Sequence, residues 1–318
     1  MNDPVFDLHC DTISALLGER YDEPGSLRTN GLHIDLERAS RLGGFGQCFA
    51  LWTYPGLTQK TGVDVQELFR RMLCLFQQEL AHNSDRISQA RSGAELRRNL
   101  SEGRMSAVLT MEGTAGIAYD PERLEELAKA GLRMTTLTWN ERNPLAGSHL
   151  SGEGLSDRGR AFVKEAQRLG ILVDVSHISD RAFWDLVKIT RGPIVASHSN
   201  SRAVCPVSRN LTDDMFRAIR ETGGVVGLNL YTDFLGAGRV TLEVPCRHIL
   251  HWLELDPEGD HLALGGDLDG CDTIPTGFSD VSSYDRLAEA LREHGLDQRI
   301  IKKLFWENAV GVMDWCCM

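Results

Sequence analysis

The sequence lacks long apolar runs and lacks an excess of basic residues. A membrane-spanning helix needs about 18 consecutive apolar residues, and no stretch of these 318 residues approaches that length. Lys and Arg number 34 against 45 Asp and Glu, which gives a formal net charge of −11. Because nucleic-acid binding requires a basic surface, we expect no nucleic-acid partner, and we also expect no membrane partner.

Paired cysteine motifs, export signals and linkers are absent as well. The eight cysteines are scattered without a C-x-x-C pair, and the N-terminal segment carries Asp3 and Asp7 where a leader would be basic and then apolar. The C-terminal residues 315–318 do not form the hydrophobic tail of a lipid-anchor signal. These absences predict reduced thiols, a cytoplasmic location and a single catalytic domain over residues 1–318.

What is present is a repeated alternation of short apolar runs and amphipathic segments. The apolar runs are rich in Val, Ile and Leu and cover residues 5–9, 45–52, 107–111, 134–139, 172–177, 194–198, 225–230 and 262–267. Helical spacing of apolar residues marks 65–81, 122–130, 158–169, 180–189, 213–221 and 245–255. Ser156 and Ser179 can cap helix N-termini, and Gly131, Gly170 and Gly223 follow helix ends.

Strands that alternate with helices predict a parallel sheet covered on both faces. Eight such units in about 300 residues fit a (β/α)8 TIM barrel, in which functional groups gather at the carboxyl ends of the strands. A doubly wound open sheet is the alternative, but it would concentrate ligand residues at one switch point. The polar residues of this sequence instead recur at the ends of many strands.

Five of the eight predicted strands end at a histidine or an acid, which are residue types that bind zinc and similar metals. These residues are His9 with Asp11, then Glu112, His177, His198 and Asp267. Side chains alternate along a strand, so His9 and Asp11 are expected to face the barrel mouth together while Cys10 points away. The first strand therefore predicts a two-point clamp for a metal ion.

Each of these residues has a structural interpretation when it is considered alone. A single histidine at a strand end is more often hydrogen-bonded than metal-bound, Glu112 could cap the next helix, and Asp267 could form a turn. Structural needs do not explain why such residues recur at the same end of successive strands. We therefore interpret the set as a metal centre.

The number of candidate ligands predicts two metal ions. His9, Asp11, Glu112, His177 and His198 exceed the four ligands of a tetrahedral site. Glu112 is the natural bridge, with His9 and Asp11 on one ion and His177 and His198 on the other. A water between ions roughly 3.5–4 Å apart would be ionised near neutral pH and act as the nucleophile. Asp267 would serve as its general base and return the proton to the leaving amine.

The chain resembles the membrane (renal) dipeptidase family, whose members are zinc metallopeptidases with an amidohydrolase-type barrel. The motifs that carry the resemblance run nearly end to end: DLHCDT (7–12), MEG (111–113), VDVSH (173–177), SHSNSRAVCPVSRN (197–210), LGGDLDG (264–270) and LFWENAVGVM (304–313). The resemblance implies two Zn²⁺ ions on the ligand set above and a dipeptide substrate. It also implies that Asp267 touches the substrate amine and that Arg209 binds the terminal carboxylate, a role that suits a guanidinium.

Two positions depart from the family pattern. Cys10 replaces a common Asn and is expected to be tolerated because it faces away from the mouth. Trp139 stands where well-known members have a histidine that helps to polarise the scissile carbonyl, and an indole can only donate, at a different reach. His149, in the loop after the fourth predicted strand, is the candidate substrate-binding replacement.

The sequence thus predicts a binuclear zinc dipeptidase and leaves two alternatives open. A related amidohydrolase could deacylate N-acyl amino acids or open cyclic amides with the same barrel and metals, because the fold does not fix the substrate. An inactive metal-binding homologue is the other alternative, prompted by Trp139, although the complete ligand set and Asp267 argue against it. Pairing of barrels into a homodimer stays open.

Overall fold

Eight parallel strands form a closed barrel in the computed structural model, which describes residues 3–18 and 25–317. The barrel strands are β1 (Val5–Cys10), β2 (Phe45–Trp52), β4 (Met105–Glu112), β5 (Leu132–Thr136), β6 (Leu172–Asp174), β7 (Ile194–Ala196), β8 (Val225–Leu228) and β9 (Leu262–Leu264). Each lies beside the next in the order β2-β1-β9-β8-β7-β6-β5-β4, and pairing of β2 with β4 closes the ring. The predicted (β/α)8 barrel and all eight predicted strands are confirmed.

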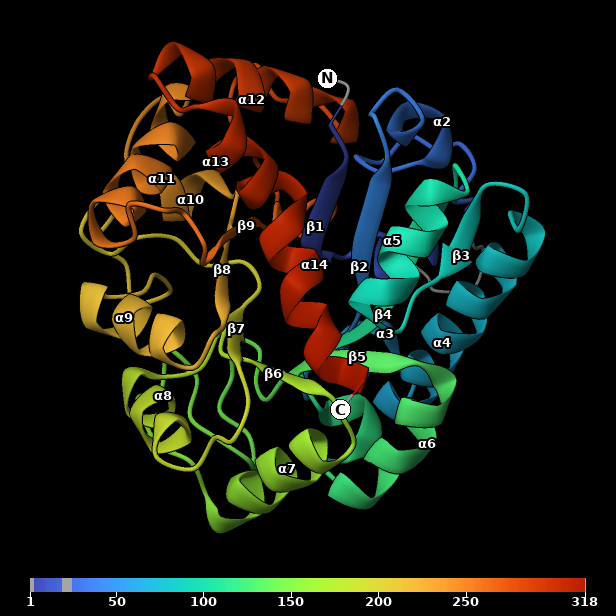
Figure 1. The fold of residues 1–318 in the computed structure, drawn as a ribbon. Coiled ribbons are helices and arrows are strands. Elements are labelled where there is room, and N and C mark those ends of the chain that lie inside the picture. Colours follow the sequence, from blue (N-terminus) through green and yellow to red (C-terminus); the bar gives the residue numbers. More distant parts are fainter. Residues whose placement is uncertain (1–2, 19–24, 318) are drawn as a thin grey trace.

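Helices surround this barrel (Figure 1). The α-helices are α1 (Thr12–Leu16), α2 (Leu36–Ala39), α3 (Leu57–Thr61), α4 (Val65–His82), α5 (Gly93–Ser101), α6 (Leu124–Ala130), α7 (Asp157–Arg168), α8 (Asp180–Val187), α9 (Asp213–Glu221), α10 (Thr232–Leu235), α11 (Glu243–Leu255), α12 (Tyr284–Glu293), α13 (Gln298–Lys302) and α14 (Asn308–Met313). All six predicted helices are present. Within the described ranges, none of the helices combines the length and apolarity that crossing a bilayer requires.

The helix ends follow the chemistry that the sequence indicates. The Ser156 hydroxyl accepts the Gly159 N–H at the start of α7, and the Ser179 hydroxyl accepts the Ala182 N–H at the start of α8. Gly131 ends α6 with φ +106°, a left-handed conformation that costs glycine nothing. A short strand that was not predicted, β3 (Ile87–Gln89), pairs with the first residues of β4 outside the ring.

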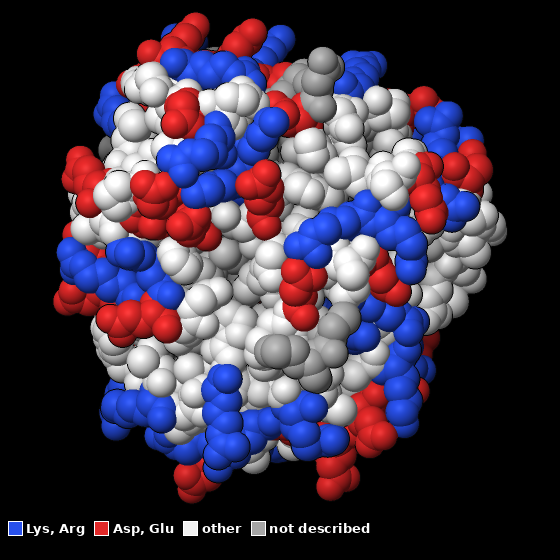
Figure 2. Space-filling model, viewed as in Figure 1, with Lys and Arg blue, Asp and Glu red and all other residues white. Residues whose placement is uncertain are grey.

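Two separate hydrophobic cores hold the layers together. The outer core lies between strands and helices, whereas the inner core fills the barrel and includes Phe6, Leu8, Trp306 and Met313. The inner core reaches α14, which lies across the end of the barrel where the strands begin (Figure 1). Lys and Arg are interspersed with Asp and Glu on this face, with uncharged surface between them (Figure 2). The opposite end, where the strands stop, carries the polar side chains.

An irregularity in β1 decides which side chains reach that end. Asp7 pairs with Gln47 and Cys10 pairs with Phe49, so β1 carries one more residue than β2 over this stretch. Such a bulge re-aims the side chains that follow it. Leu8 lies in the inner core and Cys10 in the outer core, as predicted for Cys10. Because of this bulge, the side chains of the consecutive residues Leu8 and His9 both face the interior of the barrel.

Candidate metal centre

The histidines and acids predicted at the strand ends meet at the carboxyl end of the barrel. Their ligand atoms form three groups, each with all atoms within 4.8 Å of one another: His9 with Asp11 and Glu112, Glu112 with His177 and His198, and His9 with His198 and Asp267. All six side chains are largely or fully buried. His9, His198 and Glu112 each belong to two of the groups, and Glu112, at the end of β4, is the one carboxylate among these three.

The two oxygens of Glu112 face opposite sides of this cluster. Glu112 Oε1 lies 2.8 Å from His177 Nε2 and 3.5 Å from His198 Nε2. Glu112 Oε2 lies 3.4 Å from His9 Nε2, which is itself 3.5 Å from Asp11 Oδ2. The cluster therefore contains two sets of candidate ligand atoms that share the Glu112 carboxylate.

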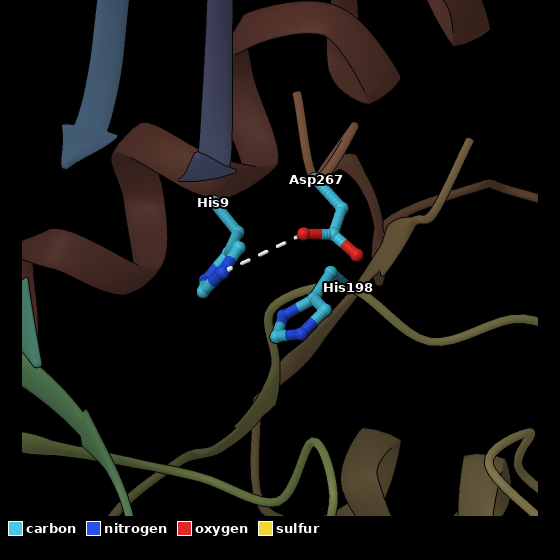
Figure 3. Close-up of side chains that lie close together, drawn as sticks. All are labelled: His9, His198 and Asp267. Atoms are coloured by element: carbon cyan, nitrogen blue, oxygen red, sulfur yellow. Dashed lines mark ion pairs between the residues drawn. The ribbon is translucent and has the colours of Figure 1, made fainter. Parts of the chain in front are cut away.

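Asp267 lies over the His9 side of the cluster. Its carboxylate is directed toward His9, with the His198 ring beside both (Figure 3), and the Asp267 Oδ1 to His9 Nε2 distance is 3.9 Å. The rings of His9 and His198 stack with centroids 3.8 Å apart. The Asn229 amide donates to Asp267 Oδ2 at 3.2 Å and holds the carboxylate in place.

Hydrogen bonds behind the histidines fix their ring orientation. The Ser197 hydroxyl donates to Asp174 Oδ2, so it can only accept from His198 Nδ1, 2.6 Å away. The His198 proton therefore resides on Nδ1, and the Nε2 lone pair faces Glu112 and His177. Such outer partners orient metal-binding imidazoles in proteins.

Burial and charge shift the pKa values of the histidines in opposite directions. Burial lowers the pKa of His177 and of His198 well below the ordinary value, aided by Arg209 and His9. Burial also opposes a charge on His9, but the carboxylates of Glu112 and Asp11 outweigh it and raise the pKa of that imidazole. A cation between these carboxylates would take the place of a proton on His9, and imidazoles together with carboxylates are the donor set that divalent metals prefer.

The unsatisfied atoms of the cluster test whether a cation fits. His9 Nε2 and Asp11 Oδ1 are buried and have no hydrogen-bond partner among the described residues. Buried polar atoms are almost always satisfied in folded proteins, so these atoms require an explanation. A bound cation would satisfy both atoms and offset the repulsion between the clustered carboxylates. The residues present fit a metal centre.

Three of the five described non-glycine residues with a positive φ lie in or next to this cluster: His177, Asp267 and Asp269. His177 has φ +72° and Asp267 has φ +56°, a left-handed conformation that side chains with a Cβ disfavour. Each such residue costs of order 1–3 kcal/mol and persists where the surrounding structure enforces it. Strain at two candidate functional residues supports a functional role for the centre.

A cavity of about 780 Å³ opens over the centre and is lined by Asp11, Glu112, His177 and Asp267 among others. One wall is aromatic: Trp52 and Trp139 line it with ring centroids 5.1 Å apart, and the Tyr54 ring packs against both, 5.1 Å from Trp52 and 4.8 Å from Trp139. The Trp139 ring is 6.4 Å from the His177 ring. The residue that departs from the family pattern therefore contributes an apolar surface beside the cluster.

The two predicted substrate-binding residues outside the cluster have different surroundings. Arg209 is buried, and its guanidinium donates to Ser199 Oγ at 2.8 Å and to the His198 carbonyl at 3.0 Å, while its Nε has no partner among the described residues. The ring nitrogens of His149 lie 3.0 Å from Asn140 Oδ1 and 3.0 Å from Ser208 Oγ. His149 is thus held against the chain, 6.1 Å from His177 between ring centroids.

Sequence reasoning missed the polar residues that orient the cluster. Asp174 and Asn229 lie in runs that were interpreted only as apolar strands, and Asn140 follows directly after such a run. A polar residue inside or directly after a buried run was the available signal, because such a residue needs a partner. Its role could not be assigned without the neighbouring strands.

Comparisons with known proteins agree with this geometry. The family profile described as membrane dipeptidase (peptidase family M19) matches residues 1–316. An uncharacterized protein from the region 5′ of pqqA in Klebsiella pneumoniae is 36% identical over 263 residues, which cover 79% of this chain and 96% of that protein. An uncharacterized dipeptidase of Schizosaccharomyces pombe is 35% identical over 214 residues, covering 65% of this chain and 52% of the relative.

A solved structure shares the whole fold. The metallopeptidase of Rhodobacter sphaeroides, crystallised with a phosphinate mimic of the dipeptide L-Ala-D-Ala, superposes with a TM-score of 0.88 at 30% identity and covers 99% of both chains. The profile match over nearly all of the sequence, together with the buried cluster of histidines and acids, leads to one conclusion: this chain belongs to the membrane dipeptidase family of metallopeptidases (peptidase family M19).

Proposed function

We propose that this protein hydrolyses dipeptides with two zinc ions bound at the end of the barrel. His9 and Asp11 would hold one ion, His177 and His198 the other, and Glu112 would bind both. The observation that carries the proposal is that the two oxygens of Glu112 face different histidines, Oε1 toward His177 at 2.8 Å and Oε2 toward His9 at 3.4 Å. When bound, such a pair of ions polarises a carbonyl and ionises a water at neutral pH.

Asp267 is suited to move the proton in this reaction. Burial, with help from the Asp11 and Glu112 charges, raises the pKa of Asp267 to about 7, against the opposing influence of His9 and Arg209. A carboxyl group with this pKa can take a proton from the attacking water and return it to the leaving amine at neutral pH. In the resting complex, its charged form can also pair with the substrate ammonium group.

Arg209 is proposed to bind the substrate's terminal carboxylate. Its guanidinium is buried near the cluster and retains an unsatisfied N–H, so a carboxylate would complete its hydrogen bonding. A dipeptide has its ammonium and carboxylate groups a short distance apart. Asp267 and Arg209 would therefore select for two-residue substrates by their separation.

Two further parts of the proposal concern the whole chain. A single catalytic domain over residues 1–318 is supported by the inner core, which joins β1 at one end of the sequence to α14 at the other. A cytoplasmic location, predicted from the scattered cysteines, is tested by cell fractionation. A substrate-binding role for His149 remains a prediction.

The test combines metal analysis with a substrate panel. The purified protein is expected to contain two zinc ions per chain and to hydrolyse dipeptides, including some with a D-residue at the C-terminal position. Chelation should abolish turnover and added Zn²⁺ should restore it. Turnover of N-acyl amino acids instead of dipeptides would contradict the proposed substrate, and stoichiometric binding of a single ion would contradict the bridging role of Glu112.

A further inference from the structure

Asn140 connects the metal centre to the loop that carries Arg209. Its Oδ1 lies 2.8 Å from His177 Nδ1 and 3.0 Å from His149 Nε2. The other nitrogen of His149 lies 3.0 Å from the hydroxyl of Ser208, which precedes Arg209. The side-chain oxygen of Asn140, the residue directly after Trp139, therefore accepts hydrogen bonds from two imidazoles at once.

The two imidazoles fix the orientation of the Asn140 amide. For His177 to offer its Nε2 lone pair to a metal, its proton must reside on Nδ1, so His177 donates to Asn140. His149 can donate from Nε2 in the same way while its Nδ1 accepts from the Ser208 hydroxyl. The acceptor of Asn140 is thereby saturated, and the amide cannot rotate to present its NH₂ group to either ring without breaking these bonds.

The NH₂ group of Asn140 is left for the cavity. Asn140 lines the cavity of about 780 Å³ together with Trp139 and His177. Its Nδ2 has no hydrogen-bond partner among residues 3–18 and 25–317, and it is absent from the buried unsatisfied atoms, so it remains accessible. An accessible donor with a fixed direction beside a metal ligand is an arrangement that can recognise an oxygen of a bound ligand.

We propose that the Asn140 amide donates a hydrogen bond to the scissile carbonyl oxygen of the dipeptide, and that His149 is the positioning residue that aims it. This inference rests on the proposed function. As the carbonyl carbon becomes tetrahedral, negative charge grows on its oxygen, and a neutral N–H stabilises this charge without transferring a proton. The role falls to Asn140 because the indole of Trp139 packs in the aromatic wall against Tyr54.

His149 gains a different role from the one that the sequence suggested. Direct substrate binding would need a free ring nitrogen, but both nitrogens of His149 are engaged with Asn140 and Ser208. Burial also lowers the pKa of His149 to about 4, with Arg209 and Arg202 contributing, so the ring is neutral at neutral pH. A neutral ring can donate through Nε2 and accept through Nδ1, as this chain of hydrogen bonds requires.

The test separates the acceptor of Asn140 from its donor. Asn140→Asp keeps an oxygen toward His177 and His149 but removes the N–H group, whereas the isosteric Asn140→Leu removes both. For Asn140→Asp we expect zinc affinity, measured by competition with a chelator, to equal or exceed that of wild type while kcat falls about 10²–10³-fold. For Asn140→Leu we expect zinc affinity to fall about 10–100-fold as well.

Binding of a phosphinate dipeptide analogue provides a second readout that needs no turnover. Its tetrahedral centre resembles the charged transition state, so Asn140→Asp should weaken its binding more than it raises KM for the dipeptide. His149→Gln should lower kcat in the wild-type background and add nothing further in the Asn140→Asp background, because both changes act on one hydrogen bond.

Asn143 provides a matched control in the same loop. Its amide donates to the Leu137 carbonyl at 2.8 Å and its Oδ1 accepts the Leu145 N–H, and it does not line the main cavity. Asn143→Asp therefore removes an amide donor at a distance from the metal centre. It should lower the melting temperature without changing zinc affinity or kcat.

Three outcomes would overturn the inference. If folded Asn140→Asp keeps the kcat and the phosphinate affinity of the wild type, Asn140 does not act as a donor to the substrate. If Asn140→Leu keeps the zinc affinity of the wild type, Asn140 does not orient His177. If Asn143→Asp and Asn140→Asp lose the same amount of kcat, both effects are explained by a loss of loop stability. If the wild type hydrolyses no dipeptide, the proposed function fails separately, because zinc and phosphinate binding still decide these points.

Discussion

Glu112 and His177 lie 2.8 Å apart at the carboxyl end of the barrel, between Oε1 and Nε2, while the second oxygen of Glu112 faces His9. One carboxylate thus connects two sets of candidate ligands that come from opposite sides of the ring of strands. If Glu112 is shared, its loss disturbs both sets at once, whereas the loss of His177, which belongs to a single ligand group, disturbs mainly that group.

Glu112→Gln is expected to lower kcat by about 10³-fold or more, since groups that act together in catalysis are lost as a unit. The substitution keeps the shape of the side chain but removes its charge. Metal content measured by mass spectrometry should fall below two ions per chain. Two tightly bound ions in this variant would show that Glu112 is dispensable for holding them.

Arg209→Lys should raise KM for dipeptides about 10–100-fold, because lysine keeps the charge but loses the planar fork that binds both carboxylate oxygens. A dipeptide amide should be hydrolysed equally by variant and wild type. Arg217→Lys is the matched control, since the Arg217 guanidinium pairs with Asp214 at 2.7 Å on the exposed face of α9. Equal effects on the free and amidated substrates would argue against a carboxylate clamp.

Metal removal should destabilise the fold. A cation that binds only the folded chain contributes about 4 kcal/mol when its concentration is a thousandfold above its Kd. Calorimetry before and after chelation is therefore expected to show a lower melting temperature in the chelated protein, and added Zn²⁺ should reverse the change. An unchanged melting temperature would mean that the buried atoms of His9 and Asp11 need no ion.

His248 makes the stability depend on pH at a site remote from the metal centre. Its Nδ1 accepts the Ser201 N–H, its Nε2 lies 2.9 Å from the Leu235 carbonyl, and burial lowers its pKa from 6.5 to about 4. Since the folded state resists protonation, the stability present above pH 6.5 is lost as the pH falls toward 4.

The loss attributable to His248 should be about 3 kcal/mol between pH 7 and pH 4. It is measured as the difference in urea unfolding free energy between the chelated wild type and chelated His248→Gln, so that the other titrating groups cancel. The advantage of wild type over the variant should shrink by this amount at pH 4. If the difference in unfolding free energy between wild type and variant does not change with pH, His248 is not the group that takes up the proton.

Much of the barrel could be predicted because its signal is local. Apolar runs such as 45–52 and 225–230 are buried on both faces, so the run alone identifies the strand, and β2 has the predicted bounds. The carboxyl ends of β5, β6, β7, β8 and β9 were predicted too late, because the residues that follow these strands turn toward the site while staying largely buried. Burial is therefore a poor guide to where a parallel strand stops.

The orientation of His9 was predicted correctly, although alternation alone does not account for it. Strict alternation from Leu8 would place His9 on the outer face, and the bulge between Asp7 and Cys10 reverses this. Nothing in the sequence marks that bulge. The buried Asp7 carboxylate holds the bulge in place: it accepts the His9 N–H beside it and, from residues distant in the sequence, the Gly266 N–H and the Tyr284 hydroxyl.

The left-handed backbone at His177 and Asp267 sets a limit on engineering this protein for heat resistance. Glycine is the residue that this conformation favours, so at both positions the mutation that relaxes the backbone also removes a side chain to which a functional role is proposed. A screen that selects only for thermal stability would therefore favour glycine at these positions. Selection for durability should therefore always be paired with a demand for turnover.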